Sequence, residues 1–454
     1  MGDNRDHVVN IITMGCSKNL VDSERLIKMF ETRGFRVKHN PEVLDRGSIV
    51  IVNTCGFIGD AKEESINMIL ELVELKKKRR IKKLYVMGCL SQRYASDLPK
   101  EIKGVNGWYG KFDWNQILDD LMPDCYCYGK AIQPWARTVT TGSHAYIKIS
   151  EGCNRFCAFC AIPIITGRMT SRPIEEIVSE VTDLVKKGIT EFNVIAQDLS
   201  SYGMDLYGEK RLAELIDRMA QVDGVKWIRL HYAYPTDFPY DVLPVMAKHP
   251  NVCKYLDIAL QHISDKVLKN MNRHITGEET RQLLARIRKE VPGIAIRTTL
   301  MVGFPGEGEK EFEELKEFVR EQRFERMGAF AYSEEEGTYA ANHLKDDVPE
   351  EVKQSRLDEL MEIQYEISEE NNNKFVGKEV IGVYEGLSED RLYYRFRTEA
   401  DSPEVDQEVL VELTFDPSKL DPNKRIPGCG RFYRLPIVEA WPYELIAETY
   451  YEID

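Results

Sequence analysis

Short apolar runs alternate with amphipathic stretches from residue 8 to about residue 130. The apolar runs NIITM, SIVIVNT and KKLYVMG predict buried strands, and the stretches LVDSERLIKMFETRG and EESINMILELVELKKK between them predict helices. A strand–helix–strand order is typical of a parallel sheet with helices on its faces. We therefore expect an N-terminal parallel α/β domain over residues 1–130.

Six further strand-like runs recur up to about residue 335, with helical stretches between them: AYIKIS, EFNVIA, KWIRLHY, KYLDIA, AIRTTLMVGF and MGAFAY. Six β/α units predict an incomplete version of the eight-unit barrel, whose site would lie at the carboxyl ends of the strands. The charged segment from Pro349 to Asn373 has a helical pattern and is expected to pack along the barrel. This central domain is predicted over residues 140–370.

The last part of the chain, residues 371–454, has short alternating segments separated by Gly, Pro, Asn and Asp, which predict a small all-β barrel. Residues 125–143 lose the periodicity and are predicted to connect the first two domains. The predicted fold class is therefore α/β: a parallel α/β domain, a partial (β/α)6 barrel and a small β-barrel.

The composition is that of a soluble globular protein, since 43% of the 454 residues are hydrophobic and 30% are charged. The apolar runs are far shorter than the roughly 18 residues of a membrane span, and the first residues do not resemble a secretory signal. We expect a cytoplasmic protein. In such a reducing compartment, ten cysteines are better explained as metal ligands or catalytic thiols than as disulfides.

The charge of the chain is strongly acidic, with a net charge of −14. Residues 371–454 contain 17 acidic and 10 basic side chains, so their net charge of −7 is half of that excess. Binding to nucleic acid through phosphate contacts requires basic side chains. The balance therefore opposes a simple nucleic-acid-binding role and favours a basic partner.

Three cysteines of the first domain each follow a predicted strand. Cys16 comes after the first run, Cys55 after SIVIVNT and Cys89 after KKLYVMG. Ligands of open α/β sheets bind at the carboxyl ends of the strands, so these thiols are expected to converge on one rim. The alternative is that they are buried structural thiols, because cysteine is often buried.

The stretch SEGCNRFCAFCAIP contains three more cysteines, Cys153, Cys157 and Cys160, after the first strand of the predicted barrel. A structural zinc site takes four ligands, and this stretch has no fourth Cys or His. Iron–sulfur cubanes normally have one Cys thiolate per iron, so three thiolates leave one iron with an open position. A reactive cluster is the favoured interpretation, and a zinc site or inert thiols are the alternatives.

The spacing C-x3-C-x-aromatic-C, with Phe159 as the aromatic residue, resembles that of the radical S-adenosylmethionine (SAM) enzymes. GCSKNLVDSE, NTCGFI and MGCLSQRY narrow the resemblance to the methylthiotransferase family over nearly the whole chain. The resemblance implies a 4Fe-4S cluster on Cys153, Cys157 and Cys160 whose open iron binds SAM. It implies a second 4Fe-4S cluster on three N-terminal cysteines, which match Cys16, Cys55 and Cys89.

The resemblance also suggests which residues contact SAM: Phe159 in the motif, Gln197 at the end of the second barrel strand and Arg297 within the fifth. An arginine suits the SAM carboxylate because its fork is bidentate. A polar strand-end cap and a structural ion pair are the alternatives for Gln197 and Arg297. No further catalytic residue is identified from the sequence.

The family divides between enzymes that modify a tRNA adenosine and the RimO branch, which modifies an aspartate of small-subunit ribosomal protein number twelve. GCSKNLVDSE, LDIALQH and EADSPEVDQEV look like the RimO branch, and the acidic C-terminal domain resembles the TRAM module. The resemblance implies insertion of a methylthio group at the aspartate β-carbon, using two SAM molecules and two clusters.

The partners implied are this ribosomal protein, free or on the ribosome, an electron donor and a sulfur donor, with no DNA and no membrane. Three alternatives stay open at this point: methylthiolation of a tRNA adenosine, an iron–sulfur protein of electron transfer or storage, and a zinc-binding scaffold.

Overall fold

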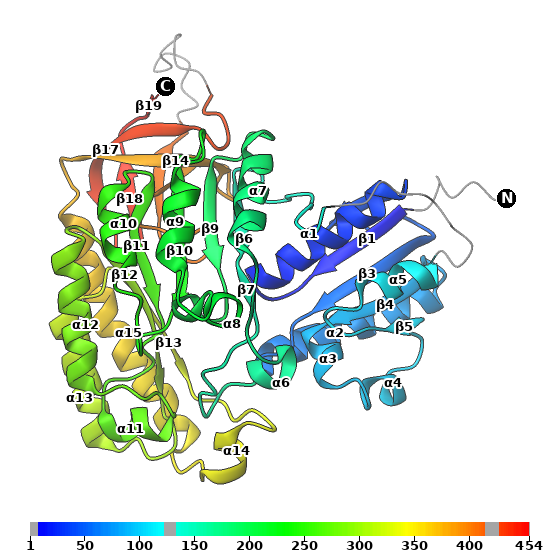
Figure 1. Ribbon diagram of the computed structural model, residues 1–454, viewed down its shortest axis with the longest axis horizontal. Helices are drawn as coiled ribbons and strands as arrows, with labels where there is room; N and C mark the ends of the chain where they lie inside the picture. The colour runs from blue at the N-terminus through cyan, green and yellow to red at the C-terminus, as the bar shows by residue number, and fades with distance from the viewer. Residues whose placement is uncertain (1–7, 122–132, 414–425, 454) are drawn as a thin grey trace.

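The chain forms three domains, which a computed structural model describes for residues 8–121, 133–413 and 426–453 (Figure 1). The N-terminal domain lies beside the central barrel, and the C-terminal domain covers one end of that barrel. None of the helices in the described ranges combines the length and apolarity needed to cross a membrane. The domain boundaries predicted at residues 130, 140 and 371 stay predictions. Residues 125–132 of the predicted connector, which include Cys125 and Cys127, lie outside the described ranges.

The N-terminal domain has a five-stranded sheet in the order β2-β1-β3-β4-β5, and every neighbouring pair is parallel. This confirms the predicted parallel sheet and adds two edge strands, β2 and β5, that the apolar pattern did not indicate. Apolar clusters fill both faces of the sheet. The strands are β1 Val8–Thr13, β2 Arg36–His39, β3 Ser48–Thr54, β4 Ile81–Gly88 and β5 Gly107–Trp108; the helices are α1 Ser17–Thr32, α2 Gly59–Lys77, α3 Cys89–Arg93, α4 Leu98–Glu101 and α5 Trp114–Leu121.

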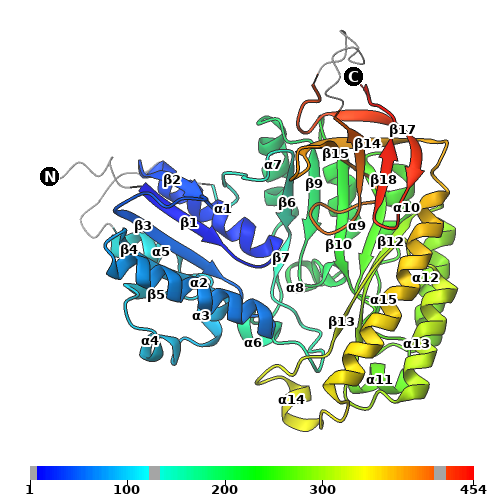
Figure 2. The same ribbon diagram turned by 180° about the vertical axis from the view of Figure 1, so that it is seen from behind.

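The central domain is an open barrel of six parallel strands in the order β13-β12-β11-β10-β9-β6, as the six apolar runs predict. Its strands are β6 His144–Lys148, β9 Glu191–Ile195, β10 Trp227–Ala233, β11 Val252–Ile258, β12 Ala295–Val302 and β13 Arg326–Ala331. Helices cover the outside of this sheet, and the long helix α15 (Glu350–Asn373) packs along β13, as expected for the charged segment (Figure 2).

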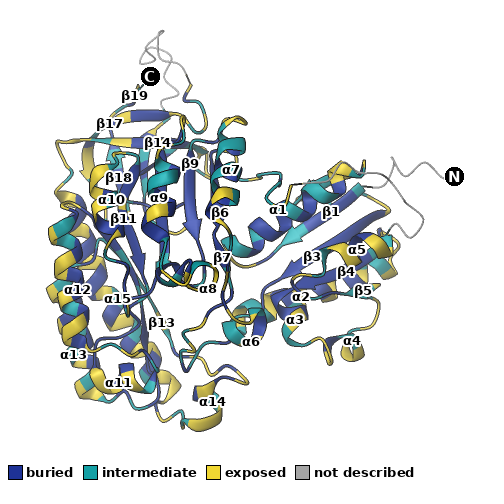
Figure 3. Cartoon of the chain, viewed as in Figure 1, coloured by how far each residue is buried: buried dark blue, intermediate teal, exposed yellow. Residues whose placement is uncertain are grey.

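The other elements of this domain are the antiparallel pair β7 Ser150–Glu151 and β8 Thr170–Ser171, the 3-10 helix η2 Leu199–Ser201, and the helices α6 Ile162–Thr166, α7 Ile174–Val185, α8 Met204–Tyr207, α9 Leu212–Ala220, α10 Val242–Lys248, α11 Asp265–Asn270, α12 Gly277–Glu290, α13 Glu309–Gln322 and α14 Tyr339–His343. The main apolar core lies between the barrel strands and the helices. Accordingly, the strands are buried and the outer faces of α12 and α13 are exposed (Figure 3).

The C-terminal domain is a small closed β-barrel, because β14 pairs with both β15 and β17. Its strands are β14 Glu379–Leu387, β15 Tyr393–Thr398, β16 Glu408–Glu412, β17 Phe432–Ala440, β18 Glu444–Ala447 and β19 Tyr451–Glu452. Aromatic rings of Tyr384, Phe396, Tyr433 and Tyr450 pack together in its core. The prediction of a small all-β domain is confirmed.

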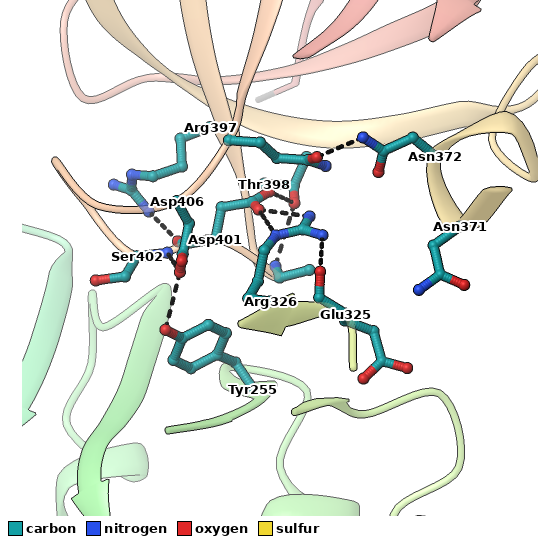
Figure 4. Close-up of polar contacts among 12 residues, drawn as sticks. Tyr255, Glu325, Arg326, Asn371, Asn372, Arg397, Thr398, Asp401, Ser402 and Asp406 are labelled. Atoms are coloured by element: carbon teal, nitrogen blue, oxygen red, sulfur yellow. Dashed lines mark hydrogen bonds and ion pairs between the residues drawn. The ribbon is translucent and has the colours of Figure 1, made fainter. Parts of the chain in front are cut away.

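This β-barrel is fixed to the amino ends of the central strands, away from the cysteine loop that follows β7. Arg326, the first residue of β13, pairs with Asp401 at 2.6 Å, and the Tyr255 hydroxyl donates to Asp406 at 2.9 Å (Figure 4). Burial of such groups is tolerated because their charges and hydrogen bonds are satisfied across the interface. The acidic C-terminal domain therefore does not cover the carboxyl ends of the barrel strands.

A second buried ion network strengthens the same interface. Glu191, the first residue of β9, pairs with Arg397 of the C-terminal domain at 2.7 Å and with Arg229 of β10, and all three side chains are 0% or 1% exposed. Burial alone would raise the pKa of Glu191, but the two guanidinium groups hold it well below its usual range.

Candidate active site between two cysteine loops

The three N-terminal cysteines lie at the carboxyl ends of neighbouring parallel strands. Cys16 precedes α1 after β1, Cys55 directly follows β3, and Cys89 begins α3 after β4. Gly15 has φ +82°, and a Cβ at this position would lie 2.7 Å from the Cys55 sulfur. The loop before Cys16 therefore passes directly against Cys55, which only a glycine permits.

One buried amide connects the three loops. Asn19 Nδ2 donates to the carbonyl oxygens of Met14 and Thr54, both at 3.0 Å, and Asn19 Oδ1 accepts from the Cys89 thiol at 3.6 Å. Burial raises the pKa of Cys89 to about 12, although Lys111 opposes this and the neighbouring thiols of Cys16 and Cys55 add to it. The Asn19 hydrogen bonds and the close approach of Gly15 to Cys55 therefore tie the three cysteine-bearing loops together at one edge of the sheet.

The second triplet lies on the loop after β7. Gly152, just before Cys153, has φ +79°, and a Cβ there would overlap the Arg168 carbonyl oxygen. Two backbone hydrogen bonds fix the middle of the loop, because Ala158 N–H donates to the Met271 carbonyl at 2.9 Å and the Ala158 carbonyl accepts from Ala340 N–H at 2.7 Å. The loop is therefore anchored to two other segments of the barrel end.

Hydrogen-bond donors surround these thiols. The Arg155 backbone N–H approaches the Cys153 sulfur at 3.5 Å, and Arg273 and the Tyr234 hydroxyl approach the Cys157 sulfur at 3.6 and 3.5 Å. Burial raises the pKa of Cys153 to about 11. Burial thus opposes the thiolate form that metal ligation requires, whereas the nearby donors and the Arg273 cation favour it.

The two cysteine loops contact each other. Cys89 packs in one apolar cluster with Ala161 and Ile165, because α3 packs against α6. Ala161 directly follows Cys160 in the sequence. Both views place α3 beside α6 at the junction of the two domains. A second contact supports this arrangement, since Arg93 at the end of α3 pairs with Glu335 of the barrel at 2.9 Å.

A buried ion network lies at the same junction. Lys111 of the N-terminal domain pairs with Glu151 at 2.9 Å and lies 3.7 Å from Asp22 of α1, while Lys148 of β6 pairs with both carboxylates. Burial would raise the pKa of Glu151, but Lys148 and Lys111 lower it to about 2. Gln197 Nε2 donates to Glu151, which places Gln197 in this network, next to the residue two positions before Cys153.

The predicted SAM contacts lie in different surroundings. Phe159 is half-buried and packs edge-on to Phe304, with ring centroids 6.2 Å apart. Gln197 Oε1 is buried and has no hydrogen-bond partner among the described residues. Arg297 instead lies between Asp257 at 3.3 Å and Asp406 at 3.2 Å, which is the structural ion pair considered as its alternative. Their contacts to SAM stay predictions.

A cavity of about 620 Å³ opens beside the two loops. It is lined by Phe57, two residues after Cys55, by Phe159 and Met301, and by the end of β13 and the start of α15. The sequence alone assigns no role to Asn19, Lys111 or the lining residue Tyr332. Asn19 lies within GCSKNLVDSE, but its contact to the Thr54 carbonyl, like the positions of Lys111 and Tyr332, depends on the fold.

The two cysteines outside the triplets that the structure describes have ordinary surroundings. Cys253 is buried beside Tyr255, and Cys429 is an exposed free thiol. Across residues 8–121, 133–413 and 426–453, no three Cys, His, Asp or Glu side chains lie close enough together to hold a single metal ion. The all-thiol donor set of each triplet fits the ligand chemistry of an iron–sulfur cluster.

Three family models match successive parts of the chain. The radical SAM superfamily matches residues 147–319, the uncharacterized protein family UPF0004 matches residues 8–110, and the TRAM domain matches residues 376–449. Membership of the radical SAM superfamily implies SAM and a 4Fe-4S cluster as cofactors.

A solved structure of TsrM, a radical SAM methyltransferase from Kitasatospora setae, has a TM-score of 0.51 at 16% identity and covers 71% of this chain and 73% of its own. This likeness shows a shared fold.

Much closer relatives extend over nearly the whole chain. The ribosomal protein uS12 methylthiotransferase RimO of Phocaeicola vulgatus is 54% identical over 442 residues, which are 97% of this chain and 99% of that protein. The protein of the same name from Parabacteroides distasonis is 55% identical over 449 residues, covering 98% and 99%. This chain therefore belongs to the family of ribosomal protein uS12 methylthiotransferases, the RimO branch of the radical SAM enzymes.

Proposed function

We propose that this enzyme replaces a hydrogen on the β-carbon of an aspartate of ribosomal protein uS12 with a methylthio group. The names of its relatives support this reaction. The observation that carries the proposal is the packing of Cys89 against Ala161, because it brings the two cysteine loops into contact. A transfer between two centres requires the reacting groups to be held within contact distance.

We assign one 4Fe-4S cluster to Cys16, Cys55 and Cys89 and a second to Cys153, Cys157 and Cys160. Each triplet leaves one iron without a protein thiolate. When bound, one SAM would supply the methyl group and the second the 5′-deoxyadenosyl radical, while the N-terminal cluster would carry the sulfur atom that an external donor delivers. An external electron donor and an external sulfur donor are required, because the chain itself supplies neither.

The protein's own residues position these groups and exclude water. Asn19 fixes the N-terminal loops relative to one another, while Tyr234 and Arg273 direct donors at Cys157. Phe159 offers an apolar wall next to the second loop, and the free Gln197 Oε1 is an acceptor for a donor group of SAM. A contact of Arg297 to SAM would require a rearrangement of its ion pairs with Asp257 and Asp406.

A basic polypeptide fits this enzyme better than RNA. The C-terminal domain has a net charge of −7, and carboxylates line the cavity beside the cysteine loops. Charge complementarity accelerates the encounter with a basic partner, whereas a nucleic acid would be repelled. The proposed location of the reaction is the cytoplasm, where the ribosomal protein is found.

The test is an anaerobic incubation of reduced, cluster-reconstituted enzyme with SAM, a sulfur source and either ribosomal protein uS12 or tRNA. We expect a methylthio mass on one aspartate of the protein and none on tRNA. The Cys153→Ala/Cys157→Ala/Cys160→Ala variant should give no product. Methylthiolation of tRNA alone would contradict the proposed substrate. Failure to cleave SAM to 5′-deoxyadenosine would favour an electron-transfer or storage protein.

A further inference from the structure

The cavity of about 620 Å³ lies at the open edge of the barrel, where the N-terminal domain faces β13 and α15. Figure 2 shows β13 and α15 on this side of the molecule, with α14 below them. One wall is the Phe57–Asp60 segment after Cys55, and the other runs from the end of β13 to the start of α15. The cavity therefore adjoins both cysteine loops, through Phe57 of the first and Phe159 of the second.

The walls of the cavity are rich in carboxylates. The acidic residues lining it are Asp60, Glu334, Glu335, Asp346 and Glu350, and the only basic residue lining it within the described ranges is Lys353. Lys353 is already paired with Asp346 at 2.7 Å. Two of the lining carboxylates are exposed at the rim of the cavity, Asp60 from the N-terminal domain and Glu334 from the barrel. The rim therefore has an excess of negative charge.

Two buried groups in the same wall have unused hydrogen-bonding capacity. The Tyr332 hydroxyl and Glu335 Oε1 have no hydrogen-bond partner among the described residues, although these residues are only 2% and 4% exposed. The other oxygen of Glu335 is paired with Lys62 at 2.7 Å and Arg93 at 2.9 Å. An unsatisfied buried polar atom is costly, so it indicates a site that a ligand completes.

The missing partner must be a hydrogen-bond donor. Glu335 Oε1 and the similarly unpaired Asp346 Oδ1 can only accept, and the Tyr332 hydroxyl can also accept. Burial and the nearby carboxylates of Glu334, Asp346 and Glu335 raise the pKa of Tyr332 to about 12, so the phenol is neutral at physiological pH. A group with several N–H donors and a positive charge satisfies this set.

We propose that this cavity binds a lysine or arginine side chain of the polypeptide substrate, close in sequence to the modified residue. The inference rests on the proposed function and adds where the substrate is recognised. Ammonium and guanidinium groups supply the donors that the wall lacks, and their charge matches the carboxylates at the rim. The site would place the neighbouring target residue between the two cysteine loops.

Two variants test this site. Asp60→Asn/Glu334→Gln removes one exposed charge from each wall, and Tyr332→Phe removes the unpaired hydroxyl while keeping the ring contact to Phe304, with centroids 4.9 Å apart. The control Glu362→Gln/Glu366→Gln removes two exposed carboxylates of α15 that do not line the cavity, so it changes the net charge equally.

The measurements are the Kd of fluorescently labelled ribosomal protein uS12 without turnover and the KM for the same protein. We expect both to rise about threefold to tenfold in the cavity variants, with the control like the wild type. The salt dependence should fall only in Asp60→Asn/Glu334→Gln, because Tyr332→Phe removes no charge. Cavity variants that bind like the control would overturn the inference. A rise confined to the KM for SAM would also overturn it, because the cavity would then belong to the cofactor.

The failure of this inference is distinguishable from the failure of the proposed function. If the wild type binds and methylthiolates the protein but the cavity variants do so equally well, only the inference is wrong. If the wild type does not modify the protein, the proposed function is wrong, and the binding measurement still decides whether the cavity recognises a basic polypeptide.

Discussion

Lys111→Met tests whether the buried ion network at the domain junction fixes the N-terminal domain to the barrel. Lys111 is 3% exposed and pairs with Glu151 of the barrel at 2.9 Å, with Asp22 of α1 nearby at 3.7 Å. Methionine has a similar length and keeps the apolar contacts of the stem. The substitution therefore removes one charge and leaves two carboxylates facing a single lysine, Lys148.

The size of the effect follows from burial. Removing one partner of a buried ion pair destabilises a protein by about 3–5 kcal/mol. Lys148 still neutralises part of the charge and Glu151 is 16% exposed, so we expect the lower end of this range, about 3 kcal/mol. For a domain of 150–250 residues this corresponds to a fall in Tm of about 6–12 °C.

Thermal unfolding and amide hydrogen exchange measure this change. Protection should fall in α1 and in the segment around Cys89, because both contact the barrel through this junction. We also expect more 5′-deoxyadenosine per methylthio product, since a loosened junction separates the two cysteine loops. Lys38→Met is the control, because Lys38 pairs with Asp45 within the N-terminal domain and both are about one-third exposed.

The control should change stability by less than about 1 kcal/mol. A double-mutant cycle with Glu151→Gln separates the pair from unrelated effects, and the double variant should be little worse than either single variant. The reasoning is refuted if Lys111→Met unfolds like Lys38→Met, or if its stability loss adds fully to that of Glu151→Gln.

Two further predictions concern the loop of the second triplet and the C-terminal interface. Gly152→Ala should lower the iron content of the enzyme without unfolding the N-terminal domain. An alanine is strained at the φ of +79° found here, and its Cβ would overlap the Arg168 carbonyl oxygen. An iron content equal to that of the wild type would contradict this prediction. Glu191→Gln should lower the Tm at pH 7, because it leaves two buried arginines underpaired. Since folding depresses the pKa of Glu191, its stabilisation is complete above the ordinary value of 4.5 and is lost as the pH falls toward the folded pKa. The Tm difference between wild type and variant should therefore narrow below about pH 4.5, and a constant difference would show that the charge of Glu191 is not its cause.

The sequence predicts the three folds well because each depends on a repeated local pattern. The six barrel strands and the strands preceding Cys16, Cys55 and Cys89 are long buried apolar runs, which give a clear signal. The edge strands β2 and β5 were missed because they have four and two residues and little apolar surface. Edge strands bury fewer side chains, so their pattern is weaker.

The candidate site is predicted only as far as its cysteines. Motif spacing identifies Cys153, Cys157 and Cys160, but it contains nothing about Asn19 or Lys111, whose roles depend on contacts between distant segments. The sequence also does not indicate that the Arg297 guanidinium pairs with Asp257 and with Asp406 of another domain, and its contact to SAM stays a prediction.

An anaerobic count of iron and acid-labile sulfide per chain tests the central claim, that two separate thiol triplets each hold a cluster. The wild type should contain about eight irons, and Cys153→Ala/Cys157→Ala/Cys160→Ala should contain about four. Cys16→Ala/Cys55→Ala/Cys89→Ala should lose the other half. If either triple variant retained all of the iron, or if the reconstituted wild type contained only one cluster, the account of two facing centres would be contradicted.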